Sequence, residues 1–158
     1  MIRSGIGYDI HRLVPNRPLI LGGIEIPCLL GLEGHSDADV LSHAIADALL
    51  GAICSGDIGQ HFPNTDESLR NISSIEILKR VTELLAKKNA SVVNIDTTII
   101  AEAPKIAPHI QAMRKKIANA TGVSDSSVSV KATTNENLGA IGRGEGIAAM
   151  AIATVEME

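Results

Sequence analysis

The sequence predicts an α+β fold: a single domain over residues 1–158, with helices layered on one face of a mixed, mostly antiparallel four-stranded sheet, as a variant of the ferredoxin-like arrangement, plus a small hairpin. Two observations lead to this prediction. At 158 residues the chain is long enough for one domain and too short to expect two. Its periodic segments follow the order strand, hairpin, helix, helix, strand, helix, strand, strand.

A first strand is predicted over residues 2–11, where apolar and polar residues alternate. Asp9 and His11 are two residues apart, so both lie on the polar face of this strand. Residues 19–26 predict a short hairpin, because the two central glycines allow the positive φ angles of a tight turn.

The first helix is predicted from an N-cap at Ser36 to Gly56, because apolar residues recur there at helical spacing. Asp39, His43 and Asp47 fall on one stripe of this helix, at positions i, i+4 and i+8. The two carboxylates can orient the His43 ring, although a solvated polar face explains Asp47 at least as well.

A loop over residues 55–71 follows, and it is longer than most connections in compact domains. Such a length is typical of a functional segment. Ser73 and Glu76 have the spacing of a capping box, which predicts a second helix that ends at Asn89.

The next strand is predicted over residues 92–101. Pro104 is compatible with the first turn of a third helix, and Gly122 is compatible with its C-cap. Residues 128–134 form the strand after that helix.

The last strand, over residues 147–155, follows a glycine-rich turn and is apolar on both faces. An antiparallel edge strand normally exposes one polar face to water. We therefore expect another subunit to cover the second face of this strand.

Composition narrows the function classes. The net charge is −4 and no basic run is present, which argues against nucleic-acid partners. No apolar run reaches the roughly 18 residues that span a membrane. Cys28 and Cys54 are too few for a disulfide framework, and residues 1–30 lack the features of a signal peptide, so we expect a cytoplasmic location.

Asp9, His11 and His43 are candidate ligands of a divalent ion. A helix packed over the polar face of the first strand would bring His43 to the other two side chains. Three ligands of this type leave one position of a tetrahedral ion open, as in catalytic zinc sites. The alternative is that these are ordinary solvated or hydrogen-bonded side chains, because an Asp-x-His pair often occurs by chance.

A second polar cluster consists of residues 133–136 and Arg143 in the glycine-rich turn. Hydroxyls, turn amides and a guanidinium can bind phosphate oxygens, and Glu136 can ligate a hard cation such as Mg2+. A purely structural turn explains the cluster about equally well.

Residues 101–105 connect a predicted strand to a predicted helix. Their small side chains allow a flat ring to approach the backbone, and amides at the start of a helix attract anions. The alternative is an ordinary connection with proline in the first helical turn.

These segments occur together and in an order that resembles the family of 2-C-methyl-D-erythritol 2,4-cyclodiphosphate synthases of the non-mevalonate isoprenoid pathway. The resemblance covers essentially the whole chain. It is carried by Tyr8-Asp9-Ile10-His11, His35-Ser36-Asp37-Ala38-Asp39-Val40-Leu41-Ser42-His43, Gly56-Asp57-Ile58-Gly59 with His61-Phe62-Pro63, Ala103-Pro104-Lys105, Lys131-Ala132-Thr133-Thr134 and Gly142-Arg143-Gly144-Glu145-Gly146.

The resemblance implies a homotrimer with active sites between subunits. The reaction would convert 4-diphosphocytidyl-2-C-methyl-D-erythritol 2-phosphate into the cyclic diphosphate and CMP. Zn2+ or Mn2+ would bind Asp9, His11 and His43, and Mg2+ or Mn2+ would bind Glu136 between the phosphates. His35 and Thr134 match residues that stabilise the transition state.

The implied substrate-binding residues form two groups. The group for the phosphorylated methylerythritol comprises Asp9, His11, His35, Ser36, Asp57, Ile58, Gly59, Phe62, Pro63, Asn64, Thr65 and Asp66. The group for cytidine and phosphate comprises Ala101, Glu102, Ala103, Pro104, Lys105, Ile106, Ala107, Thr133, Thr134, Asn135, Glu136 and Arg143. The chain departs from the usual pattern at Asn64, where relatives commonly have Asp, and at Ala140, where many have Phe.

Two other functions use the same residues. A metal-dependent phosphohydrolase or nuclease would activate water with the same ligands. A non-catalytic trimer would bind nucleotides or isoprenoid phosphates without turnover.

Overall fold

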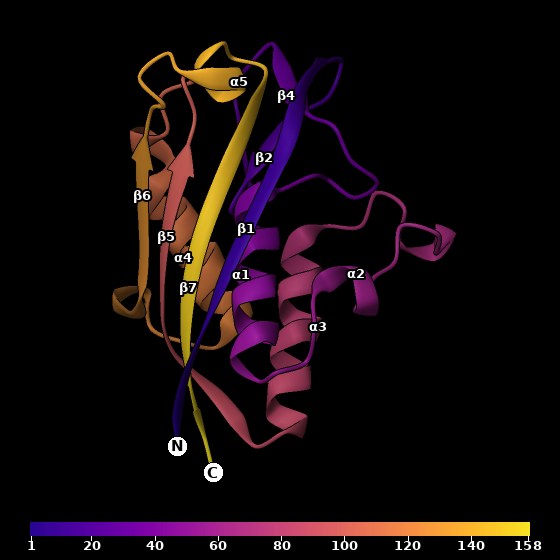
Figure 1. Ribbon diagram of the computed structural model, residues 1–158, viewed down its shortest axis with the longest axis vertical. Helices are drawn as coiled ribbons and strands as arrows, with labels where there is room; N and C mark the ends of the chain where they lie inside the picture. Colours follow the sequence, from indigo (N-terminus) through magenta and orange to yellow (C-terminus); the bar gives the residue numbers. More distant parts are fainter.

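The computed structural model describes residues 1–158 and contains one five-stranded mixed sheet with helices on one face (Figure 1). A separate two-stranded hairpin lies beside it. The strands are β1 (Ile2–Pro15), β2 (Leu19–Leu21), β3 (Ile24–Ile26), β4 (Leu30–Leu32), β5 (Ala90–Ile100), β6 (Val128–Thr133) and β7 (Gly146–Met157). The helices are α1 (Val40–Ala52), α2 (Ile58–His61), α3 (Ser74–Lys87), α4 (Ile110–Thr121) and α5 (Gly139–Gly142).

The sheet has the strand order β4-β1-β7-β5-β6, in which only β5 and β6 are parallel. The α+β class and the mixed sheet are confirmed, but the expected count of four strands is wrong. The additional strand is β4, whose three residues are too few to show an alternating pattern. The last strand, β7, is an interior strand between β1 and β5.

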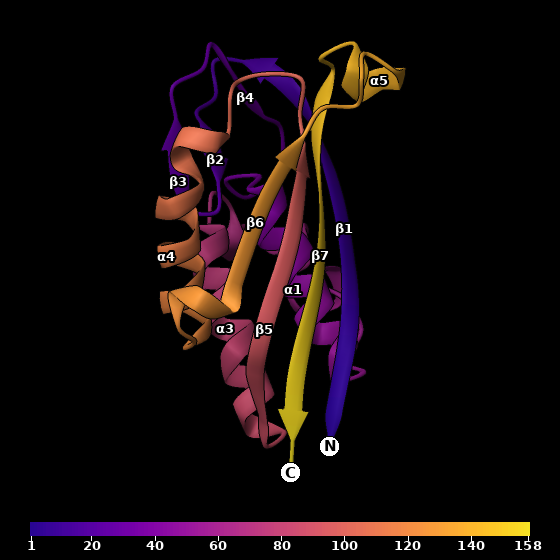
Figure 2. The same ribbon diagram turned by 90° about the vertical axis from the view of Figure 1, so that its left-hand side faces the viewer.

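The helices α1, α3 and α4 cover one face of the sheet and leave the other face bare, as Figure 2 shows from the bare side. Six apolar side chains of β1 and β7 are exposed on or beside this bare face, each by at least 45%. They are Ile2, Ile6, Tyr8, Ile10, Met150 and Ile152. A single chain therefore leaves a large apolar strip open to water.

Helix α1 packs directly on the backbone of β1. A Cβ atom at Gly7 would collide with the carbonyl oxygen of Ala44, and one at Gly5 would collide with that of Ala48. Only glycine allows this approach, and it brings the start of α1 over the face of β1 that carries Asp9.

The first helix begins later than expected, because Asp39 rather than Ser36 is its N-cap. The Asp39 carboxylate is fully buried and accepts hydrogen bonds from the backbone N–H groups of Gly22, Gly23 and Ser42. Burial raises the pKa of this carboxyl group above its usual value. Asp39 therefore joins the hairpin turn to α1. The sequence had suggested that Asp39 orients the His43 ring, but its carboxylate is engaged by these backbone groups instead.

Two other helix starts differ from the predictions. Ser73 does precede α3, but its side chain makes no capping hydrogen bond. Helix α4 begins at Ile110 and not near Pro104, since a short 3-10 turn over Ala107–His109 precedes it and carries another proline in its first positions. The C-cap at Gly122 is confirmed by its left-handed φ of 73°.

None of the helices combines the length and the apolar character that crossing a lipid bilayer requires.

Candidate active site

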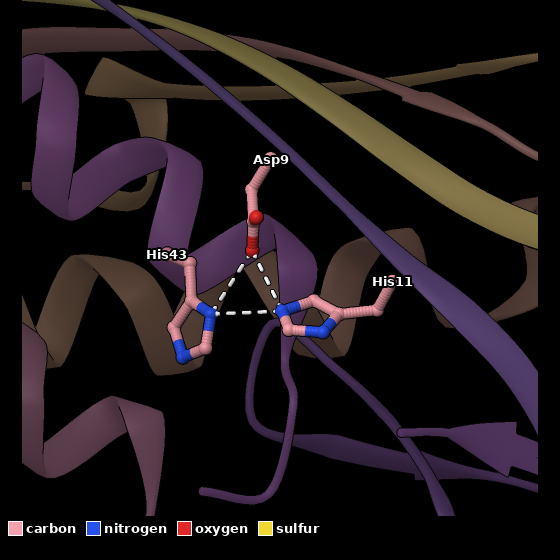
Figure 3. Close-up of side chains that lie close together, drawn as sticks. All are labelled: Asp9, His11 and His43. Carbon is pink, nitrogen blue, oxygen red and sulfur yellow. Dashed lines mark hydrogen bonds and ion pairs between the residues drawn. The ribbon is translucent and has the colours of Figure 1, made fainter. Parts of the chain in front are cut away.

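Three candidate metal ligands meet where α1 crosses β1 (Figure 3). The Oδ2 atom of Asp9 lies 2.9 Å from Nε2 of His11 and 3.0 Å from Nδ1 of His43. The two ring nitrogens are 3.3 Å apart. The prediction that a helix brings His43 to the polar face of the first strand is therefore confirmed.

The charges in this triad stabilise one another. Burial alone raises the pKa of Asp9, but the hydrogen bonds and charges of His11 and His43 outweigh burial and lower the pKa to about 2. Burial likewise lowers the pKa of His11, but the neighbouring Asp9 carboxylate outweighs it and raises this pKa. A cation placed between the three side chains would take over the role of these protons.

The donor set matches a zinc-type ion. Bonds of about 2.0–2.1 Å in tetrahedral geometry put neighbouring ligand atoms about 3.3 Å apart. The observed separations of 2.9, 3.0 and 3.3 Å approach this value without any rearrangement of the backbone. The Nδ1 atom of His11 is 2.7 Å from the carbonyl oxygen of Glu33, to which it donates, so its Nε2 lone pair faces the other ligands.

A cavity of about 250 Å³ opens beside the triad. Nine of the predicted substrate or metal residues line it together with four residues that were not predicted, whereas the other predicted residues lie outside. The lining consists of Asp9, His11, Gly34, His35, Ser36, His43, Ile58, Gly59, Phe62, Asn64, Leu69, Ile72 and Ile77. The long loop over residues 55–71 therefore closes one side of the candidate active site.

Four predicted residues of that loop do not line the cavity. Asp57 caps α2 by accepting a hydrogen bond from the N–H of Gln60, and Asp66 caps a 3-10 turn. Pro63 and Thr65 are exposed. Asp47 accepts a hydrogen bond from the N–H of Ile58 at 2.8 Å, so it holds the loop in place, and it makes no hydrogen bond to the His43 ring.

The predicted cytidine and phosphate group is elsewhere, and most of it is open to solvent, although Ala101 and Ile106 are buried. Every residue from 131 to 140 is exposed, and Glu136 is not part of the metal-ligand group. The Glu102 carboxylate accepts hydrogen bonds from the N–H groups of Asn135 and Asn137, at 2.8 and 3.2 Å. Arg143 forms an exposed ion pair with Glu145.

The register of the sheet puts Asp9 and Thr133 on opposite faces. Ile10, Ala148, Ile100 and Thr133 are aligned across four strands and hence share one face of the sheet. Asp9 is adjacent to Ile10 and therefore belongs to the opposite face. Within one chain, the Thr133 side chain and the Asp9 carboxylate cannot meet on one ligand.

Some residues that shape the cavity were not predicted. Arg17 donates hydrogen bonds to the carbonyl oxygens of Gly34 and Ser36, at 2.9 and 2.8 Å, and so holds the segment with His35. Ser74 lies 2.8 Å from the outer ring nitrogen of His43. Neither residue shows a local pattern that marks it, because each acts on a segment distant in the sequence.

Comparison with known proteins identifies the family. The YgbB family model matches residues 2–156. The chain belongs to the YgbB family.

Curated YgbB relatives share more than half of their residues with the chain. A protein named 2-C-methyl-D-erythritol 2,4-cyclodiphosphate synthase from Alkaliphilus metalliredigens is 58% identical over 98% of this chain and 97% of its own length. The protein of the same name from Pelotomaculum thermopropionicum is 54% identical over 98% of this chain and 95% of its own length.

Solved structures agree with this assignment to the YgbB family. The bifunctional IspDF from Campylobacter jejuni matches with a TM-score of 0.96 and 40% identity, over 100% of this chain and 43% of that longer one. The CDP complex of IspF from Plasmodium falciparum matches with a TM-score of 0.87 and 35% identity, over 99% of this chain and 97% of that one.

Proposed function

We propose that the protein converts 4-diphosphocytidyl-2-C-methyl-D-erythritol 2-phosphate into 2-C-methyl-D-erythritol 2,4-cyclodiphosphate and CMP. The observation that carries this proposal is the convergence of Asp9, His11 and His43 beside a cavity lined by His35 and Ser36. Full-length relatives at 54% and 58% identity, named for this activity, support it. A CDP complex of a similar fold supports recognition of a cytidine diphosphate group.

In this proposal Asp9, His11 and His43 would hold a Zn2+ or Mn2+ ion, and Glu136 would ligate Mg2+ or Mn2+. When bound, such ions neutralise phosphate charge and polarise phosphorus–oxygen bonds. The net charge of the chain is −4, so its own side chains supply little of the positive charge that a diphosphate needs.

The chain's own residues act mainly by positioning. The 2-phosphate attacks the β-phosphorus of the same molecule, and CMP leaves as a phosphate with a second pKa of about 6. Such a leaving group needs little help from a general acid, so we assign no catalytic base or acid. Ser36 and the backbone around Gly59 bind the methylerythritol phosphate, and His35 and Thr134 stabilise the transition state.

The active form in this proposal is a homotrimer whose sites lie between subunits. Two observations support it. The Thr133 side chain and the Asp9 carboxylate belong to opposite faces of the sheet, so a complete site needs cytidine-binding residues from a second copy. The apolar strip on β1 and β7, with Ile6 66% and Ile152 51% exposed, is the surface for self-association.

Phosphorus NMR of a reaction mixture tests the activity directly. With the diphosphocytidyl substrate and added divalent ions, we expect a cyclic diphosphate and CMP in equal amounts. Release of inorganic phosphate or of a linear diphosphate would contradict the cyclase proposal and support the phosphohydrolase. Tight binding without turnover would instead support a non-catalytic nucleotide-binding trimer.

A further inference from the structure

The His43 ring faces Asp9 with its Nδ1 atom and is held by a chain of hydrogen bonds at its Nε2 atom. The Nε2 atom of His43 lies 2.8 Å from the hydroxyl oxygen of Ser74, at the first position of α3. The Ser74 hydroxyl in turn contacts Oδ1 of Asp37. The Ser36 hydroxyl, at 3.2 Å, is a longer second contact of the same ring nitrogen.

The direction of this chain follows from the number of hydrogens available. Asp37 accepts from the N–H groups of Ser74 and Asp39 and from the Ser74 hydroxyl, which is the behaviour of an ionised carboxylate. The single hydrogen of the Ser74 hydroxyl therefore points at Asp37. Its oxygen can then only accept from His43, so Nε2 of the ring carries a proton. When a cation takes the place of the hydrogen between Nδ1 and Asp9, the neutral ring keeps only this proton.

We infer that Asp37 and Ser74 are positioning residues, which keep a proton on Nε2 of His43 and so leave Nδ1 as the atom that binds a cation together with Asp9 and His11. The Nδ1 atom is the one that lies 3.0 Å from Asp9, so the position of this proton and the direction of the ring agree. Ser74 is 0% exposed, so water does not replace its hydroxyl. This inference rests on the proposed metal site and adds two residues that act through His43.

The same contacts join two distant segments. The N–H of Asp37 donates to the carbonyl oxygen of Ile72, and the N–H of Asn71 donates to that of His35, at 3.1 and 2.9 Å. Ser74 is consequently held against the His43 ring although the two residues are 31 positions apart. The segment that carries the predicted catalytic His35 and the start of α3 thus form one hydrogen-bonded unit.

The test compares Ser74→Ala with Ser73→Ala. Both variants remove one hydroxyl at the start of α3, but the Ser73 side chain makes no capping hydrogen bond. We expect Ser74→Ala to weaken Zn2+ binding about 10- to 100-fold, as measured by competition with a chelator, and Ser73→Ala to change it less than about 2-fold. Equal Zn2+ affinity of Ser74→Ala and the unchanged protein would overturn the inference.

A second measurement needs no metal. Two-bond 1H–15N correlation spectra of the metal-free protein at neutral pH report which nitrogen of His43 carries the proton. We expect a proton on Nε2 in the unchanged protein and a shift toward the neutral tautomer with a proton on Nδ1 alone in Ser74→Ala. A predominant form with a proton on Nδ1 alone in the unchanged protein would refute the inference, whereas failure of the unchanged protein to bind Zn2+ would refute the proposed metal site instead.

Discussion

The metal-ligand triad and the segment from Thr133 to Arg143 differ in how completely one chain builds them. Asp9, His11 and His43 lie within 3.3 Å of one another, on a strand and a helix that pack through glycine backbone. The segment after β6 is exposed at every position from 131 to 140. One chain therefore prearranges the candidate metal ligands, whereas the exposed residues proposed to bind cytidine and phosphate lack a surface that faces them.

This difference indicates a division of tasks between subunits. Burial and hydrogen bonds fix the triad before any ligand arrives, so little ordering remains at the moment of binding. The exposed segment is ordered locally, through the Glu102 carboxylate and the N–H groups of Asn135 and Asn137. In the proposed trimer, another copy of the chain supplies the complementary surface.

Removing divalent ions should have the largest effect, because it disables the prearranged triad. We expect exhaustive chelation to lower turnover about 1000-fold or more, equivalent to about 4 kcal/mol of transition-state stabilisation. Added Zn2+ or Mn2+ together with Mg2+ should restore it. Metal content by elemental analysis, measured beside activity, checks this expectation; undiminished turnover in metal-free protein would contradict the metal role.

Charged substitutions in the apolar strip should abolish the contribution of the exposed segment but leave the metal-ligand triad intact. In the double variant Ile6→Asp and Ile152→Asp we expect monomers by light scattering and at least about 100-fold lower activity, since the site loses its second half. Zn2+ affinity should stay within a few-fold. Leu29→Asp is the matched control, because Leu29 is 94% exposed and lies outside β1 and β7. A fully active monomer would show that one chain suffices.

The packing of α1 on β1 can be tested with single methyl groups. Gly7→Ala should lower the free energy of unfolding by about 3 kcal/mol, because its Cβ would collide with the Ala44 carbonyl and displace the helix that carries His43. Gly51→Ala is the control, since the nearest atoms to its Cβ are 3.9 Å away. Urea unfolding measures the free energy of unfolding of both variants. Equal values for Gly7→Ala and Gly51→Ala would mean that the close approach of α1 to β1 is not required.

A substitution that loosens only the exposed segment should leave the metal site unchanged. Glu102→Ala removes the acceptor of two backbone N–H groups, each worth about 1 kcal/mol, so we expect KM to rise about 10-fold. Zn2+ affinity should remain the same. Glu83→Ala, an exposed glutamate on α3, serves as the control. Parallel loss of Zn2+ affinity in Glu102→Ala would show that the two regions are coupled.

The smallest expected effect is the acid stability of the metal-free triad. The pKa of Asp9 is lowered from 3.8 to about 2, so its contribution to stability is present above pH 3.8 and is lost as the pH falls toward 2. We expect the unchanged protein to lose about 1–2 kcal/mol more than Asp9→Asn over this interval. Urea unfolding at several pH values measures the difference, and parallel curves would contradict the shift.

Local patterns in the sequence were sufficient for most of the fold. Alternation over β1 correctly put Asp9 and His11 on one face, and helical spacing correctly assigned His43 to a helix. The hairpin and the C-cap at Gly122 also follow from local backbone requirements. Strand β4 and the position of β7 in the sheet escaped prediction, because three residues carry no period and strand order depends on pairing between distant segments.

The sequence by itself determined which side chains share a face of a strand or helix, since that follows from the backbone period alone. Only the tertiary structure decided which carboxylate acts on which partner: Asp39 caps α1, Asp47 holds Ile58, and Asp37 reaches His43 through Ser74. It also decided that Asp9 and Thr133 belong to opposite faces of one sheet. These relations depend on hydrogen bonds and strand pairing between segments far apart in the chain, for which no local spacing is diagnostic.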